Sequence, residues 1–341
     1  MKMIDLRSDT VTKPSPNMLD AMFAAQVGDD VFEEDPEVNK LEALAATMFG
    51  FEKSLFCPSG TMTNQIAIKV HTQPGEGLIC HKLSHIYNYE GGGIAFNSGV
   101  SAQLIEGENG IISPLDIIAN INGDDLYSAK TSLVVVENSC NKAGGIIYTV
   151  QNLTEISNVC RQHKLALHLD GARIFNALSA SGNQPIELAN VFDSASVCLS
   201  KGLGCPVGSL LLGSSDFIKK ARKVRKVFGG GMRQAGFLAA AGSYALVHNI
   251  KRLAEDHVRA KWLARDLENL PWIESILPVY TNIIVAKIPI AFNTKTIVEK
   301  LKQYNILVVP FGAGKIRLVT HLDITDGDVE IACNVFKKIK F

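Results

Sequence analysis

Residues 166–208 read ALHLDGARIFNALSASGNQPIELANVFDSASVCLSKGLGCPVG, and this stretch decides how the chain is organised. It contains two apolar runs. The first ends at Asp170 and the second ends just before Lys201, which stands 201 − 170 = 31 positions after the aspartate. Short apolar runs bounded by turn residues are typical of buried strands. We therefore expect a carboxylate at the end of one buried strand and a primary amine at the end of another.

This pair of groups suits pyridoxal phosphate (PLP). Its chemistry requires an amine that forms a Schiff base and a carboxylate beside the pyridinium nitrogen. Lys201 is the single charged residue between Ser194 and Ser215, and three glycines that follow it let the backbone pass close to a ligand. Taken singly, Asp170 could cap a turn and Lys201 could be a solvated loop residue. The combination favours a PLP site.

The wider sequence resembles the threonine aldolase family, a branch of the fold-type-I PLP enzymes close to the aromatic β-eliminating lyases. The resemblance rests on LHLDGAR and LSKGLGCPVGSLLLG in the stretch above. It rests also on MIDLRSDTVTKPSPNMLDAM, GDDVFEEDPEVNKLE, PSGTMTNQ, SHIYNYEGGG and GGGMRQAGFLAAAGSYAL, which occur in the family's order. The similarity runs from Met3 to about Arg259, with one further segment near Arg317. It implies retro-aldol cleavage of a β-hydroxy-α-amino acid, L-allo-threonine or L-threonine, to glycine and acetaldehyde.

Length and composition indicate two domains with a full apolar interior, since the chain has 341 residues of which 47% are hydrophobic. The resemblance implies an α/β fold of the fold-type-I PLP enzymes. We expect a large PLP-binding domain over residues 1–250, with a mostly parallel sheet between helices and an N-terminal segment at 1–35. A small α+β domain is expected over residues 251–341.

The charge balance argues against nucleic acid or an anionic membrane surface as the main partner, because 34 basic residues offset 34 acidic ones. No apolar run approaches the ~20 residues of a membrane span, and the first residues lack a signal-peptide core. Seven cysteines without paired spacing fit reduced thiols, so we expect a cytoplasmic protein. No cluster of metal-ligand residues stands out around His168, and no catalytic metal is expected.

Hydrophobic periodicity predicts the main elements. It indicates a helix over 36–49, a strand over 54–57, a buried strand over 132–136 and a continuous helical stretch over 237–267. The basic helix at 216–226 is expected to be mostly a solvated face. Between strand 54–57 and the next helix stands Pro58-Ser59-Gly60-Thr61, and the N–H groups of Gly60 and Thr61 at a helix start suit the PLP phosphate.

The resemblance assigns further residues to the cofactor. Lys201 would form the Schiff base, and His85 would stack on the pyridine ring. Glu90, five positions on, would hold a water or assist proton transfer. Arg233, after three glycines, would reach the PLP phosphate of a neighbouring subunit, so we expect a homo-oligomer that is a dimer of dimers.

Three residues are candidates for the substrate carboxylate. Arg173 stands three positions after Asp170, and its planar, permanently charged fork could bond both the PLP phenolate and the carboxylate. The resemblance adds Ser8, in the run LRSDT, and Arg317, at the end of the last predicted strand.

The sequence departs from the family at two positions. Threonine aldolases commonly have tyrosine where this chain has Phe32, and their Glu-Asn-Thr-His-Asn motif carries a histidine that faces the substrate hydroxyl, where this chain has Cys140. A neutral thiol is a poor donor and a poor base. We expect activity to survive without that histidine, and His85 or a water held by Glu90 are the candidates to accept the β-hydroxyl proton.

Two alternatives stay open. A less polar pocket at Phe32 and Cys140 would suit a β-eliminating lyase, or an aldolase for a bulkier, phenylserine-like substrate. A protein that binds PLP without turnover is the alternative from another class.

Overall fold

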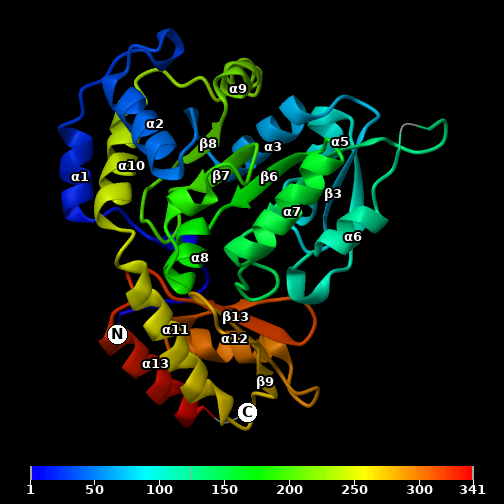
Figure 1. The fold of residues 1–341 in the computed structure, drawn as a ribbon. Coiled ribbons are helices and arrows are strands. Elements are labelled where there is room, and N and C mark those ends of the chain that lie inside the picture. Colours follow the sequence, from blue (N-terminus) through cyan, green and yellow to red (C-terminus); the bar gives the residue numbers. More distant parts are fainter. Residues whose placement is uncertain (1, 124, 340–341) are drawn as a thin grey trace.

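The computed structural model describes residues 2–123 and 125–339, and a seven-stranded sheet forms its larger part (Figure 1). The strands lie in the order β2 (Lys53–Cys57), β8 (Ser209–Gly213), β7 (Ser194–Cys198), β6 (Ala166–Gly171), β5 (Thr131–Glu137), β3 (Gly77–His81) and β4 (Ser101–Ile105). Strand β8 runs antiparallel to both of its neighbours, and all other pairings in this sheet are parallel. The predicted, mostly parallel α/β architecture is confirmed.

Both faces of this sheet are buried under helices. On β5, Val134 and Val136 belong to one apolar core, and Leu133 and Val135 belong to another on the opposite face. This explains why the strand is a continuous apolar run rather than an alternating one. The helices of this part are α1 (Pro16–Phe23), α2 (Pro36–Phe49), α3 (Gly60–His71), α4 (His85–Asn88), α5 (Gly93–Ser98), α6 (Pro114–Ala119), α7 (Val150–Gln162), α8 (Ile174–Ser181), α9 (Ser215–Val227) and α10 (Gly236–His248).

The C-terminal part forms a second layer below the first in Figure 1. Its antiparallel sheet has the order β12 (Val309–Pro310), β13 (Lys315–Val319), β10 (Ile283–Lys287) and β9 (Ser275–Ile276). Helices α11 (Leu253–Glu268), α12 (Thr294–Gln303) and α13 (Asp326–Lys338) pack with it around a separate core. No helix within residues 2–123 and 125–339 combines the length and the apolar character that crossing a membrane requires.

The start of the chain joins this C-terminal layer. Strand β1 (Ile4–Asp5) pairs in parallel with β11 (Ile306–Leu307), and Ile4 and Leu6 lie in the C-terminal core. The predicted N-terminal segment at 1–35 therefore begins against the smaller part before it reaches the larger one. The division near residue 250 stays a prediction.

One predicted element needs correction, and a second has a buried residue that the prediction did not include. The helical stretch over 237–267 is broken between α10 and α11, where Asn249 donates a side-chain hydrogen bond to the carbonyl of Leu203 at 2.8 Å and holds the turn. The basic helix α9 presents a largely solvated face as predicted, with its four lysines exposed, but Arg225 on the same helix is buried, at 2% exposed. Its guanidinium pairs with Asp30 at 2.7 Å and donates to the carbonyl of Phe56 at 2.7 Å, so its charge has a partner inside the protein, although its Nε has no hydrogen-bond partner.

Two histidines at the larger sheet share one serine, and of the two His168 is buried and His71 is half-buried. His71 Nε2 and His168 Nδ1 each lie 2.8 Å from Ser194 Oγ. Burial lowers the pKa of His71 to about 4 and that of His168 to about 3, so both rings are neutral in the folded protein near neutral pH. When the pH is below the ordinary histidine pKa of about 6.5, these histidines bind protons in the unfolded chain but stay neutral in the folded chain.

The free energy of unfolding should therefore fall as the pH drops from about 6.5 towards the lowered pKa values of these histidines. For His168 the loss between about pH 7 and about pH 5 should be about 2 kcal/mol. Urea unfolding of His168→Gln should show a smaller difference between the two pH values than wild type. His163→Gln, which changes an exposed histidine, should keep the wild-type dependence. Equal pH dependence in all three proteins would contradict the prediction.

Candidate active site

The ends of β6 and β7 define the site. The two strands are parallel neighbours, so their carboxyl ends meet at one edge of the sheet. Asp170 lies in β6 and is 1% exposed, and Lys201 follows three residues after Cys198, the last residue of β7. Lys201 Nζ lies 3.3 Å from Cys198 Sγ. The prediction that one buried strand delivers the carboxylate and another delivers the amine is confirmed, and the structure adds that the two strands are neighbours.

A pocket of about 360 Å³ opens at this edge. Five predicted residues line it together: Ser8, His85, Arg173, Lys201 and Arg317. Arg317 comes from β13 of the C-terminal layer, so the pocket lies between the two parts of the molecule. Residues from segments more than 300 positions apart in the sequence thus face one space, as the resemblance implied.

Asp170 lies behind this pocket and is held from two sides. Asn64 of α3 donates to its Oδ2 at 3.0 Å, and the backbone N–H of Ala172 donates to its Oδ1 at 3.2 Å. His168 Nε2 lies 3.2 Å from the Asn64 side-chain oxygen, which orients that amide. The carboxylate therefore has one defined orientation, as a fixed partner for a protonated ring nitrogen requires.

His85 is backed by Glu90. Its Nδ1 lies 2.9 Å from Glu90 Oε1, while Asn64 and Gln65 donate to Glu90 at 2.9 and 2.6 Å. Burial lowers the pKa of His85, but the hydrogen bond with Glu90 and the charges of Asp170, Glu90 and Glu137 outweigh burial and raise the pKa above its ordinary value. Glu90 is buried behind the ring and is not among the residues that line the pocket. From this position Glu90 is suited to orient His85 rather than to hold a water molecule in the pocket.

Candidate ligand atoms of His85, Glu90 and Asp170 lie within 4.8 Å of one another, a spacing that a metal ion could use. These atoms already have partners, however. One Asn64 amide nitrogen donates to both carboxylates, and His85 is bonded to Glu90. The cluster works as a hydrogen-bonded support for the histidine and the aspartate.

The predicted phosphate cradle lies at the N-terminus of α3. The first N–H groups of a helix have no acceptor within the helix, and Ser59 caps only Met62 N, at 3.2 Å. A Cβ at Gly60 would stand 2.5 Å from Cys198 Sγ, so only glycine lets the helix start approach the strand that delivers Lys201. Thr61 is exposed, and neither Gly60 nor Thr61 lines the pocket itself.

Two cations face the pocket. Arg173 is clamped from behind by Asp9, whose Oδ2 accepts from Nε at 2.7 Å and whose Oδ1 accepts from a terminal nitrogen at 2.6 Å. Although burial opposes it, the Arg173 charge lowers the pKa of Asp9 to about 2. Arg317 donates to the side-chain oxygen of Asn141 at 2.9 Å and to the carbonyl of Arg7 at 3.0 Å. Burial and the neighbouring Arg173 charge lower the pKa of Arg317 to about 10. Among the described residues no carboxylate pairs with Arg317, whereas Arg173 already pairs with Asp9.

Some pocket residues were missed at the level of sequence. Glu137 and Asn141 both line the pocket, and Asp9 supports it. Glu137 ends the buried strand β5 as Asp170 ends β6, and the two stand opposite each other in the sheet. The signal that pointed to Asp170 was therefore present at Glu137 as well.

Three residues singled out by the resemblance lie elsewhere. Cys140 is 1% exposed and is not among the residues lining the pocket. Its Sγ would stand 3.0 Å from a Cβ at Gly110, and burial raises its pKa far above the ordinary thiol value. Arg233 is half exposed and pairs with Asp29 at 3.0 Å, and Phe32 is 70% exposed. Neither Cys140 nor Arg233 thus lines the pocket of its own chain.

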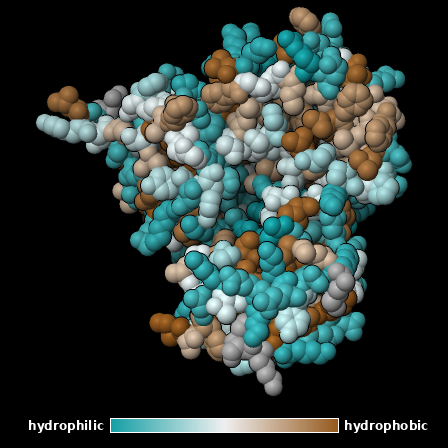
Figure 2. All heavy atoms as spheres, turned by 180° about the vertical axis from the view of Figure 1, so that it is seen from behind, coloured by the Kyte–Doolittle hydropathy of each residue, from teal (hydrophilic) through white to brown (hydrophobic). Residues whose placement is uncertain are grey.

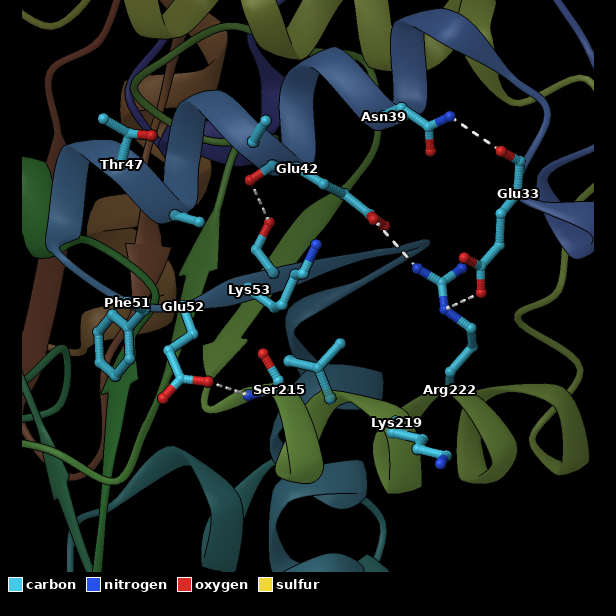
Figure 3. Close-up of a pocket in the computed structure, with 14 residues that line it drawn as sticks. Glu33, Asn39, Glu42, Thr47, Phe51, Glu52, Lys53, Ser215, Lys219 and Arg222 are labelled. Atoms are coloured by element: carbon cyan, nitrogen blue, oxygen red, sulfur yellow. Dashed lines mark hydrogen bonds and ion pairs between the residues drawn. The ribbon is translucent and has the colours of Figure 1, made fainter.

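Another pocket, of about 490 Å³, lies between α2 and α9 (Figure 3). There Arg222 pairs with Glu33 and Glu42 at 3.2 and 3.1 Å, and Glu52 accepts from the backbone N–H of Ser215. Its polar groups largely satisfy one another. Neither Lys201 nor the two arginines of the first pocket occur here, so the edge of β6 and β7 remains the candidate site.

Comparison with known proteins identifies the family of this chain. The family described as beta-eliminating lyase matches residues 5–290. The low specificity L-threonine aldolase of Escherichia coli (strain K12) is 44% identical over 324 residues, which cover 95% of each chain. The probable low-specificity L-threonine aldolase 2 of Arabidopsis thaliana is 39% identical and covers 99% of this chain and 98% of its own.

A solved structure supports the fold. The threonine aldolase of Leishmania major superposes with a TM-score of 0.83 at 24% identity, covering 98% of this chain and 99% of that chain. At 24% identity, this match shows the fold alone. The relatives at 44% and 39% identity show that the chain is similar to threonine aldolases. This chain therefore belongs to the β-eliminating lyase family, in its threonine aldolase branch.

Proposed function

We propose that this chain is a PLP-dependent aldolase that cleaves L-allo-threonine and L-threonine to glycine and acetaldehyde. The observation that carries the proposal is a single pocket in which Lys201 faces two arginines, in front of the buried Asp170. The names of relatives that match the chain over nearly its whole length support the same activity.

The donor set fits PLP. Lys201 would hold its aldehyde carbon, Asp170 would pair with the ring nitrogen, and His85 would cover one face of the ring. The free N–H groups at Gly60 and Thr61 would bind its phosphate. When bound, PLP supplies an acceptor for the electron pair released as a bond to the substrate Cα breaks.

The substrate carboxylate has a ready counterpart in Arg317 and Arg173, with Ser8 at the same wall. An anion between the two guanidinium groups would relieve their mutual repulsion and form charge-assisted hydrogen bonds. Fixing the carboxylate fixes rotation about the bond from the substrate nitrogen to Cα. The bond between Cα and Cβ can then be held in the orientation that favours its cleavage.

We also infer a cytoplasmic homo-oligomer, a dimer of dimers. The seven cysteines are all free and buried, which fits a reducing compartment. Around α1, Phe23 is 83% exposed and Leu19 is 39% exposed. Figure 2 shows hydrophobic side chains at this edge of the larger layer, a surface suited to a second copy. Arg233, with no role in its own pocket, would reach the PLP phosphate of that copy.

The direct test measures aldehyde and glycine released from L-threonine and from L-allo-threonine by the purified, PLP-loaded protein. Equal amounts of the two products are expected, and Lys201→Ala should release neither above background, because it lacks the amine that holds the cofactor. Pyruvate and ammonia would instead establish β-elimination. PLP binding without product from threonine, serine or phenylserine would mark a protein without turnover.

Asp9 should act as a positioning residue for Arg173. Asp9→Asn removes the charge from a bidentate clamp, and a charge-assisted bond contributes roughly 1.5–3 kcal/mol, so KM for threonine should rise about 10- to 100-fold with a smaller change in kcat. Steady-state kinetics provide the measurement. Asp5→Asn breaks the part-exposed pair with Arg7 and should leave KM unchanged. An equal KM in both variants would contradict this role of Asp9.

A further inference from the structure

The side chain of Glu137 occupies a defined place in the wall of the pocket. Its Oε2 accepts from the backbone N–H of His85 at 2.9 Å, and its Oε1 accepts from the backbone N–H of Asn141 at 2.9 Å. Each carboxylate oxygen therefore keeps a further lone pair. The residue is 6% exposed, yet it lines the same pocket as Lys201 and His85.

Glu137 also lacks a cationic partner. In the part of the chain that the structure describes, no lysine or arginine pairs with it, in contrast to Asp9, which is clamped to Arg173. A carboxylate that is oriented by two N–H groups, but not neutralised by a cation, keeps its capacity to take up a proton.

The other candidates for this role are less suitable. Glu90 lies behind the ring of His85, and His85 Nδ1 is occupied by Glu90. Cys140 points to Gly110 instead of the pocket. Glu137 is thus the carboxylate of the pocket wall that remains available to a substrate.

We propose that Glu137 is the catalytic base that accepts the β-hydroxyl proton of the substrate, in place of a histidine at position 140. The inference rests on the proposed aldolase function and adds to it the group that the sequence left unnamed. It requires the hydroxyl of the bound amino acid to face the edge of β5.

The step balances without a further reactant. The O–H bond breaks and its proton passes to a Glu137 carboxylate oxygen, while the electron pair of that bond forms the second C–O bond of the aldehyde. The bond between Cα and Cβ breaks at the same time and leaves its electron pair at Cα. A proton then adds at Cα to give glycine, and Glu137 returns its own proton to solvent.

The electrostatic surroundings suit this task. Burial and the neighbouring Asp170 raise the pKa of Glu137 to about 7, although His85 and the two backbone N–H groups lower it. Arg173 also lies within electrostatic reach, and Cys140 and Tyr148 stand close by. A base with a pKa near the working pH combines sufficient ionisation with sufficient proton affinity. Because the charged form is the active one, the rate should fall as the pH drops through about 7.

The test compares two reactions of Glu137→Gln in the PLP-loaded enzyme. Cleavage of L-threonine should slow by about 10²- to 10⁴-fold, the usual contribution of a general base. Exchange of the glycine α-proton with D₂O, followed by NMR, should continue near the wild-type rate, because glycine has no β-hydroxyl. Cofactor absorbance and thermal unfolding should resemble wild type.

Two further variants sharpen the outcome. Glu137→Asp keeps a carboxylate and should recover part of the cleavage rate, with a shifted pH profile. Glu106→Gln changes an exposed carboxylate after β4 and should behave as wild type in both reactions.

The outcomes separate the possible failures. Parallel loss of cleavage and exchange in Glu137→Gln would assign it a structural role and overturn the inference. Unchanged cleavage with an unchanged pH profile would place the base elsewhere. Absence of aldehyde from the wild-type enzyme would instead overturn the proposed function, and this inference with it.

Discussion

Parallel pairing of β5, β6 and β7 is the constraint on which the site depends. Parallel strands end at the same edge of a sheet, so the chain can bring Glu137, Asp170 and Lys201 together although long segments separate them. Both faces of the sheet are covered by helices, and its edge is where polar groups can meet a ligand. The apolar strands therefore position the chemistry without taking part in it.

A second constraint on the pocket comes from the N-terminal segment. The N-terminal segment starts against the C-terminal layer through β1 and β11, and then delivers Asp9 to Arg173. Asn282 of the C-terminal layer donates to the same aspartate at 3.2 Å. One buried carboxylate thus links three separate stretches of chain. Buried charges of this kind are stable only when fully paired, and the pairing ties the orientation of Arg173 to the packing of both layers.

Cys140 and Glu137 show how reasoning from sequence can misdirect attention. Comparison with the family's motif drew attention to position 140, where the residue type differs from the family. It drew attention away from Glu137, where the residue type is the same. In the structure the cysteine turns to Gly110 and the glutamate faces the pocket. Side-chain direction at the end of a strand depends on the loop that follows. Here that loop doubles back, with Cys140 opposite Ile146, and no pattern of residue types reveals it.

The sequence by itself determined the buried strands and the placement of Asp170 and Lys201 at strand ends, because hydrophobic periodicity and strand-end residues are local properties. It also determined the family, through segments of nearly unbroken similarity. Only the tertiary structure decided that Arg225 is buried, that Glu90 supports His85, and that Glu137 lines the pocket of Arg173 and Arg317. These relations join residues far apart in the chain. The free energies of these side-chain contacts depend on burial and on the nearest charged partner, and both are defined only once the chain is folded.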